Sequence, residues 1–400
     1  MRVKPAAERA IKQRHPWLFD QSIVRQSHEG RSGDLAVIFD QRNRFLAIGL
    51  YDPDSPIRVR LLQYGEQATI DQAWFRERLV SAGLRRAPLQ NTKTTGYRLV
   101  HGENDELPGL VVDLYGKTVV IKLDTAAWIP HLWPITQALA EVEPDLRMIL
   151  RLSRKARYEA ETSHGLQDGQ LLVGSPIDGP VVFYENGIIF EADVIRGQKT
   201  GFFLDQRDNR ALVEATVATN KRLKRLVNVF AYSGAFGLYA ARGGIESVTS
   251  IDASPAALEM ANNNFKLNRN NPTIAATEHS ILVGDAFKML SELGAQGQRY
   301  DLVVVDPPSF AKQKSEFGRA LNAYFRLATL ALAILQKDGI LVMSSCSSRV
   351  SADAFYEIIH TAADRRNRPL REITRTGHAI DHPVGFPQGA YLKCLFAFAG

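Results

Sequence analysis

The stretch LVNVFAYSGAFG, from Leu226 to Gly237, decides the fold of the second half of this 400-residue chain. An apolar run that ends at Phe230 leads into a loop whose glycines, Gly234 and Gly237, let the backbone turn tightly and approach a ligand. A helical pattern follows the loop. On its own the loop is a weak signal, because it lacks the full G-x-G-x-x-G spacing and would equally serve NAD or a simple tight turn.

Strands and helices alternate from about residue 191 onward. RLVNVF, SVTSID, YDLVVVD and GILVMSS are apolar, β-branched runs, and each is followed by a helical pattern. Continuous apolar strands that alternate with helices indicate a parallel sheet covered on both faces. The final run, AYLKCLFAFA, is expected to be the last strand of this sheet. A Rossmann-type α/β domain is therefore predicted for residues 191–400.

Acidic residues follow three further strands of the predicted sheet. Asp252 ends the second strand about 20 residues after the glycine loop, where a doubly wound fold places the acid that holds a ribose diol. Asp285 follows the third strand, where its carboxylate or the adjacent backbone would meet an adenine amino group. Asp306 opens a DPP motif after the fourth strand. All of them would line one rim of the sheet, where ligands bind in such folds.

Taken together, these features resemble the class I S-adenosylmethionine methyltransferases. The resemblance implies S-adenosylmethionine as the cofactor. It also implies a set of cofactor-binding candidates at the strand ends: Phe230, Tyr232, Ser233, Gly234, Asp252, Asp285 and Asp306.

Cys346 ends the fifth strand, in ILVMSSCSS, on the same rim as Asp306. Carbon 5 of a pyrimidine is a poor nucleophile, and a thiolate that adds to carbon 6 turns it into an enamine-like one. Asp306 would then hydrogen-bond the Watson–Crick edge of the base, because negative charge develops at the ring nitrogen. The alternative is that Cys346 is a small apolar residue closing a strand. Cys394, inside an apolar run, is expected to be a core thiol.

The first 190 residues have a different pattern. Strand candidates at Asp34–Asp40, Arg44–Asp52 and Ile57–Tyr64 predict a small all-β module over residues 1–72. Residues 73–190 predict an α+β central domain, with a helix that begins near Asp71, a hairpin formed by LVVDLY and TVVIKL, and a helix and strand near Trp133–Leu152.

The composition is that of a globular protein, with 45% hydrophobic and 23% charged residues. The sequence has no long apolar run and no signal-peptide pattern at its start, so the cytoplasm is the expected location. Two cysteines cannot form a metal cluster by themselves. The net charge of +6 suits a polyanionic partner such as nucleic acid.

At a finer level the chain resembles the bacterial 23S ribosomal RNA cytosine-C5 methyltransferases that have an N-terminal PUA domain. The resemblance rests on RHPWLF, YRLVHGENDELPGLVVDLYG, GQKTGFFLDQRDNR, VNVFAYSGAFG, DPPSF, SSCSS and DHPVGFPQGAYLK, in this order. It implies that Gly197–Arg210 lies over the cofactor, with Gln206 and Arg207 near the methionine part. A polar helix start is the alternative for this segment. The resemblance further implies 23S ribosomal RNA as the substrate and suggests a homodimer.

One departure concerns product release. Many RNA cytosine-C5 methyltransferases carry a second cysteine after the prolines of the fourth motif, and this chain has Ser309 there. A related subfamily that methylates guanine shares the LDQR and DPP-x-F elements but lacks the cysteine of the sixth motif. Cys346 therefore separates the two chemistries. A third hypothesis, from another class, is an RNA-binding assembly factor without catalysis.

Basic residues are expected to hold RNA phosphates. Candidates lie near the start of the chain and in the loop after DPPSF: Arg2, Lys4, Arg9, Lys12, Arg14, Arg25, Lys312, Lys314 and Arg319. Trp17, which lies among the first group, is expected to be a packing residue rather than a stacking platform.

Overall fold

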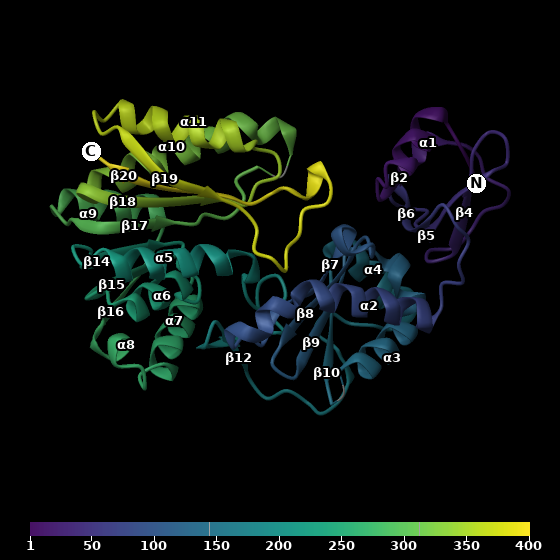
Figure 1. The fold of residues 1–400 in the computed structure, drawn as a ribbon, viewed down its shortest axis with the longest axis horizontal. Helices are drawn as coiled ribbons and strands as arrows, with labels where there is room; N and C mark the ends of the chain where they lie inside the picture. Colours follow the sequence, from purple (N-terminus) through teal and green to yellow (C-terminus); the bar gives the residue numbers. More distant parts are fainter. Residues whose placement is uncertain (144, 312) are drawn as a thin grey trace. The chain divides into compact units, whose positions relative to one another are not determined.

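The computed structural model describes residues 1–143, 145–311 and 313–400, and the chain divides into two compact units. Figure 1 shows the course of the chain through its helices and strands. Unit 1 comprises Met1–Gly187, Ala192–Leu204 and Ile380–Phe386. Unit 2 comprises Ile188–Glu191, Asp205–Ala379 and Pro387–Gly400. Among the described residues, no helix is both long and apolar enough to cross a membrane.

Unit 1 begins with a six-stranded sheet in the order β2-β6-β5-β4-β1-β3. Its strands are β1 (Arg2–Val3), β2 (Trp17–Phe19), β3 (Ile23–Arg25), β4 (Leu35–Phe39), β5 (Phe45–Tyr51) and β6 (Ile57–Tyr64). The structure corrects the all-β prediction for this part, because helix α1 (Pro5–Lys12) packs beside the sheet. The helix is hard to recognise in the sequence because it is short and fully buries only Ile11.

A second, five-stranded sheet of unit 1 has the order β11-β10-β9-β8-β7. Its strands are β7 (Gly96–His101), β8 (Leu110–Tyr115), β9 (Thr118–Leu123), β10 (Arg147–Leu152) and β11 (Leu171–Val173), and its helices are α2 (Gln72–Arg86), α3 (Leu132–Val142) and α4 (Arg154–His164). The side chain of Asp71 caps α2 by accepting the main-chain N–H of Trp74 at 3.0 Å. The predicted hairpin is β8 and β9.

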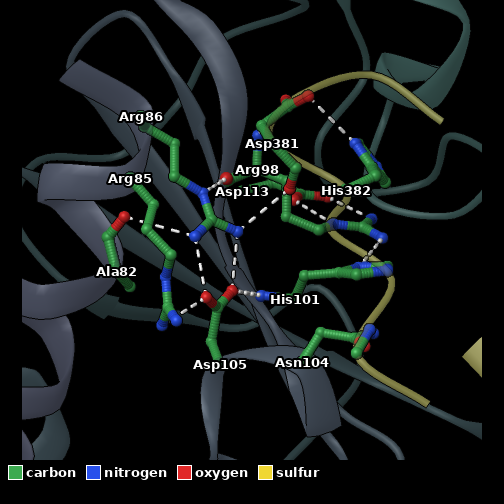
Figure 2. Close-up of polar contacts among 11 residues, drawn as sticks. Ala82, Arg85, Arg86, Arg98, His101, Asn104, Asp105, Asp113, Asp381 and His382 are labelled. Carbon is green, nitrogen blue, oxygen red and sulfur yellow. Dashed lines mark hydrogen bonds and ion pairs between the residues drawn. The ribbon is translucent and has the colours of Figure 1, made fainter. Parts of the chain in front are cut away.

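A buried network of charged side chains holds Ile380–Phe386 within unit 1 (Figure 2). Arg86 donates to the two carboxylate oxygens of Asp105 at 2.8 and 2.6 Å, and to the main-chain oxygen of Asp381 at 3.0 Å. The carboxylate of Asp381 accepts the main-chain N–H of Arg98 at 2.9 Å. Because these buried charges are paired, their desolvation is offset, and DHPVGF has a fixed structural position.

Unit 2 contains a seven-stranded sheet in the order β16-β15-β14-β17-β18-β20-β19. Its strands are β14 (Arg225–Val229), β15 (Ser247–Asp252), β16 (Glu278–Val283), β17 (Tyr300–Val305), β18 (Leu335–Ser345), β19 (Leu370–Thr376) and β20 (Lys393–Ala399). The first five run parallel, and β20 pairs antiparallel with both β18 and β19. Two strands earlier in the chain are β12 (Val181–Glu185) and β13 (Ile188–Ala192).

Helices cover both faces of this sheet (Figure 1). The helices of unit 2 are α5 (Arg207–Thr219), α6 (Ala235–Gly243), α7 (Pro255–Leu267), α8 (Pro272–Ala276), α9 (Ala286–Ala295), α10 (Phe317–Ile334) and α11 (Ala352–Asp364). One face packs with α9, α10 and α11 into a continuous apolar core. The glycine at 237 lets α6 approach the other face, because a Cβ there would lie 2.7 Å from a methyl group of Val248.

The predicted fold class is confirmed: a Rossmann-type α/β domain follows a small β-rich part and an α+β part. The predicted last strand is β20. The sequence analysis did not identify β19, whose residues are mostly exposed. The division into 1–72, 73–190 and 191–400 stays a prediction.

Candidate active site

The register of the parallel strands brings the predicted residues to one edge of the sheet. Val229 of β14 lies between Ile251 of β15 and Val305 of β17. Val305 in turn pairs with Met343 of β18. The residues that follow these positions therefore lie side by side at the carboxyl edge of the sheet, where open α/β sheets bind ligands. They are Phe230, Asp252, Asp306 and Ser344.

The loop after β14 has an unusual backbone. Phe230, Tyr232 and Gly234 all have positive φ angles, of 60°, 47° and 74°. Positive φ is costly for residues with a side chain, and such strain gathers at functional sites. Gly234 also lies against α7, since a Cβ at this position would be 2.7 Å from the Cβ of Ala261. The loop then enters α6, whose N-terminus favours an anionic or polar ligand.

Asp252 is held by the loop that it faces. One carboxylate oxygen accepts the main-chain N–H of Tyr232 at 2.9 Å, and the other accepts that of Ser254 at 2.9 Å. Each carboxylate oxygen has a second lone pair, so the half-buried group retains acceptors for two hydroxyls. This donor set and the backbone-lined loop fit a nucleoside ribose, as a nucleoside cofactor requires.

Asn264 is a residue of this site that the sequence analysis missed. Its side-chain amide donates to the main-chain oxygen of Ser233 at 2.9 Å and accepts the main-chain N–H of Glu191 at 3.0 Å. It is fully buried on α7. Asn264 therefore fixes the glycine loop to α7 through the main-chain oxygen of Ser233. The only hint in the sequence is the polar run NNN inside an otherwise amphipathic helix.

Asp306 belongs to a hydrogen-bonded chain of polar side chains. Gln206 donates to its Oδ1 at 2.8 Å, and the Ser344 hydroxyl donates to the same oxygen. Asn209 donates to the amide oxygen of Gln206 at 2.5 Å, and Thr376 donates to the amide oxygen of Asn209 at 2.5 Å. The structure thus brings Gln206 and Asp306 together. The two donors on one oxygen fix the orientation of the carboxyl group.

The two cysteines lie in different environments. Cys346 is half-buried, and its Sγ lies 3.9 Å from the main-chain oxygen of Pro307 in the DPP motif. The thiol is therefore beside the residue that follows Asp306. Cys394 has no exposed surface, and burial raises the pKa of its thiol. Cys394 is thus the core thiol expected from the sequence, whereas the role of Cys346 stays a prediction.

Two predicted cofactor residues have other visible contacts. Arg207 is buried at the start of α5, with its Nε 3.3 Å from the carboxylate of Asp208. Asp285 is exposed, and its carboxylate caps α9 by accepting the main-chain N–H of Lys288 at 3.0 Å. Asp285 therefore lies at the N-terminus of α9, and Arg207 directly follows Gln206 in the chain.

The N-terminal RNA candidates are partly engaged within unit 1. Trp17 donates to the carboxylate of Glu103 at 2.9 Å and packs edge-to-face on Phe386, with ring centres 5.3 Å apart. This is the packing role expected for Trp17. Arg14 lies 2.8 Å from the carboxylate of Glu106, in an exposed ion pair of the kind that contributes little to stability. Lys312 lies outside the described residues.

Known proteins resemble the chain along its whole length. A family profile described as a PUA-like domain matches residues 1–64, and one described as S-adenosylmethionine-dependent methyltransferase matches residues 151–390. The "Ribosomal RNA large subunit methyltransferase" of Deinococcus radiodurans is 45% identical over 99% of this chain and 96% of its own. The "Ribosomal RNA large subunit methyltransferase I" of Tolumonas auensis is 35% identical over 97% of this chain and 96% of its own.

A solved structure has the same architecture. A chain from Streptococcus mutans described as a S-adenosylmethionine-dependent methyltransferase superposes with a TM-score of 0.82. The match covers 100% of this chain and 99% of the other at 20% sequence identity. At this identity the likeness concerns the fold.

Proposed function

Because this chain belongs to the S-adenosylmethionine-dependent methyltransferases of large-subunit ribosomal RNA, we propose that it methylates carbon 5 of a cytosine in 23S ribosomal RNA through a covalent adduct on Cys346. The family supplies the reaction class and the cofactor. The target atom and the covalent step are the proposal.

S-adenosylmethionine supplies an electrophilic methyl group when it is bound. Asp252 would accept hydrogen bonds from its ribose hydroxyls, with the loop from Phe230 to Gly234 forming the wall of the site. Asn264 would keep that loop in place through the Ser233 carbonyl. Gln206, Arg207 and Asp285 remain proposed cofactor residues. Of these three, Gln206 has the strongest support, because its side chain bonds to Asp306, which follows β17 at the carboxyl edge of the sheet.

Cys346 would act as the nucleophile. Its thiolate would form a bond to carbon 6 of the cytosine, and the electron pair of the 5,6 double bond would become available at carbon 5. Carbon 5 would take the methyl group as the bond from that group to the sulfonium sulfur breaks, with S-adenosylhomocysteine as the leaving group. A base then removes the proton from carbon 5. The carbon–sulfur bond breaks, the double bond re-forms, and the thiolate is regenerated. The target cytosine must leave its stack to reach the sulfur.

Asp306 would bind the Watson–Crick edge of the cytosine. Thiolate addition places negative charge on the ring nitrogen, and Asp306 would stabilise the adduct in its protonated form, by donating its O–H to that nitrogen. Gln206 and Ser344 would hold that carboxyl group in one orientation, because both donate to its Oδ1. The residues that follow β17 and β18 would thus meet one base from two sides.

The observation that carries this proposal is the position of the Cys346 sulfur, 3.9 Å from the carbonyl oxygen of Pro307 in the DPP motif. The test is a nucleoside digest of 23S RNA incubated with the enzyme, analysed by chromatography and mass spectrometry. Wild type should yield 5-methylcytidine, and Cys346→Ala should yield none while it still binds S-adenosylmethionine. Cys394→Ala is the matched control and should stay active. Methylated guanosine as the product would replace the cytosine mechanism with the guanine alternative.

The remaining expectations belong to the same proposal. Residues 1–72 would be the PUA-like RNA-binding domain, 73–190 the central domain and 191–400 the catalytic domain. The enzyme would act in the cytoplasm, and a homodimer is the expected assembly.

A further inference from the structure

A buried lysine lies next to the Cys346 loop, and the mechanism above does not use it. Lys393 is 5% exposed. It is the first residue of β20 and pairs with Ser345 of β18, which immediately precedes Cys346. Burying an ammonium group is costly, so a lysine in this position needs a compensating reason.

The ammonium group of Lys393 organises the loop that follows the cysteine. It donates to the main-chain oxygens of Ser347 and Val350, the latter at 2.6 Å, and to that of Tyr391 at 3.2 Å. An ammonium group has three N–H donors, and these three carbonyls match them in number. The backbone from Ser347 to Val350 is therefore held to β20, and the position of Cys346 is fixed from its C-terminal side.

The charge of Lys393 lacks a carboxylate partner. In the part of the chain that the structure describes, no Asp or Glu lies within ion-pair distance of its Nζ. Burial lowers the pKa of Lys393 to about 8, and a negative charge on Cys346 acts in the opposite direction. The amine is thus mostly protonated at neutral pH. Tyr324 of α10 lies near this loop, and its hydroxyl bonds to that of Ser345 at 2.8 Å; burial raises its pKa, so it stays neutral. Asp306 is a further charged group here, since both it and Cys346 interact electrostatically with Tyr324.

We propose that Lys393 is the counter-ion of the Cys346 thiolate and the residue that positions its loop, a role that rests on the proposed function of Cys346 as nucleophile. A fixed cation beside a partly buried thiol favours the thiolate and lowers the pKa of the cysteine. The carbonyl oxygens around this cation carry no net charge, so the thiolate would be its first anionic partner. Lys393 does not touch the substrate in this scheme and acts through the sulfur.

The test measures the thiol directly and does not depend on methyl transfer. The rate of alkylation by iodoacetamide is followed against pH, and peptide mass spectrometry separates Cys346 from Cys394. In wild type, the midpoint for Cys346 should lie well below about 8.5, the value for an unperturbed cysteine. A wild-type midpoint at or above that value would overturn the proposal, whatever the variants do.

Three substitutions separate the charge from the loop contacts. Lys393→Gln keeps N–H donors without charge, Lys393→Met removes both, and Lys393→Arg keeps both. Gln and Met should move the midpoint up by about one pH unit and slow alkylation at pH 7 by about tenfold, whereas Arg should stay near wild type. A Gln variant with the wild-type midpoint would refute the counter-ion role. If Met fails to fold, the comparison of Gln with Arg decides.

This outcome is distinguishable from failure of the proposed function. A low wild-type midpoint that rises in Lys393→Gln, combined with full methylation by Cys346→Ala, would leave the counter-ion intact and remove the nucleophile. If Cys346 instead formed the RNA adduct normally while its wild-type alkylation midpoint was that of an unperturbed cysteine, the nucleophile would stand and the counter-ion role would be refuted.

Discussion

Replacing Gly234 by alanine should damage the cofactor site in a way that two neighbouring glycines can calibrate. Gly234 has a φ of +74°, and an added Cβ would lie 2.7 Å from the Cβ of Ala261 on α7. Gly244 has a φ of +98° but open space around the added Cβ. At Gly237 an added Cβ would also make a close contact, at 2.7 Å from a methyl group of Val248, but the backbone there is not left-handed. The three positions thus separate strain from crowding.

The magnitudes follow from these two contributions. A left-handed backbone costs an alanine about 1–2 kcal/mol of folding free energy. Overpacking a close contact costs about 1–3 kcal/mol. Gly244→Ala should therefore lose about 1–2 kcal/mol, Gly237→Ala about 1–3 kcal/mol, and Gly234→Ala about 2–5 kcal/mol. Because Gly234 lies in the loop that we propose lines the cofactor site, its variant alone should also bind S-adenosylmethionine more weakly, by about tenfold or more.

Hydrogen exchange of the α6 and α7 peptides in unit 2 and calorimetry with S-adenosylmethionine are suitable assays. The chain's 4 tryptophans all lie in the segment Met1–Gly187, so their fluorescence follows unit 1 and should be unchanged. If Gly234→Ala matched Gly244→Ala in both stability and cofactor affinity, the close approach of the loop to α7 would have no role in the site.

Three further predictions concern other parts of the structure. Asn264→Ala leaves the Ser233 carbonyl and the Glu191 N–H without their side-chain partner, so it should destabilise unit 2 by about 1–3 kcal/mol. The same variant should bind S-adenosylmethionine more weakly in calorimetry. Unchanged affinity would contradict the role of Asn264 in holding the glycine loop. Asp105→Asn breaks the buried two-bond pair with Arg86 and should cost about 3–5 kcal/mol, measured by urea unfolding with tryptophan fluorescence. Neutralising Glu143, the exposed partner of Lys117, should change the stability far less. Burial lowers the pKa of His279 to about 4 from a usual value of 6.5, so the unfolded chain binds the extra proton and unit 2 should lose up to about 3 kcal/mol as pH falls from about 6.5 to 4. His279→Phe keeps a ring stacked on Phe265 and should remove most of this loss, as followed by hydrogen exchange at each pH.

The fold of unit 2 could be predicted because its strands are continuous apolar runs and its turns contain glycine and proline. The same signal located Asp252, Asp306 and Cys346, since the carboxyl ends of parallel strands share one edge. Helix α1 was missed because it buries little, and β19 because its solvent-facing residues obscure the strand pattern.

Long-range polar partners could not be predicted from the sequence. Thr376 bonds to Asn209 across 167 residues, and Gln206 bonds to Asp306 across 100. Such contacts depend on the strand order, and a single sequence does not specify which side chains lie opposite each other. Lys393 was missed for a related reason, because a lysine within an apolar run looks like an ordinary edge residue until its antiparallel register with Ser345 is known.

The central claim is a covalent bond between Cys346 and carbon 6 of a cytosine, and trapping that bond tests it most directly. RNA that carries 5-fluorocytosine is incubated with the enzyme and S-adenosylmethionine, because the fluorine prevents the final elimination. Wild type should form a stable protein–RNA complex whose cross-linked peptide contains Cys346, and Cys346→Ser should form none. A wild-type enzyme that methylates 23S RNA but forms no complex with the fluorinated RNA would contradict the account.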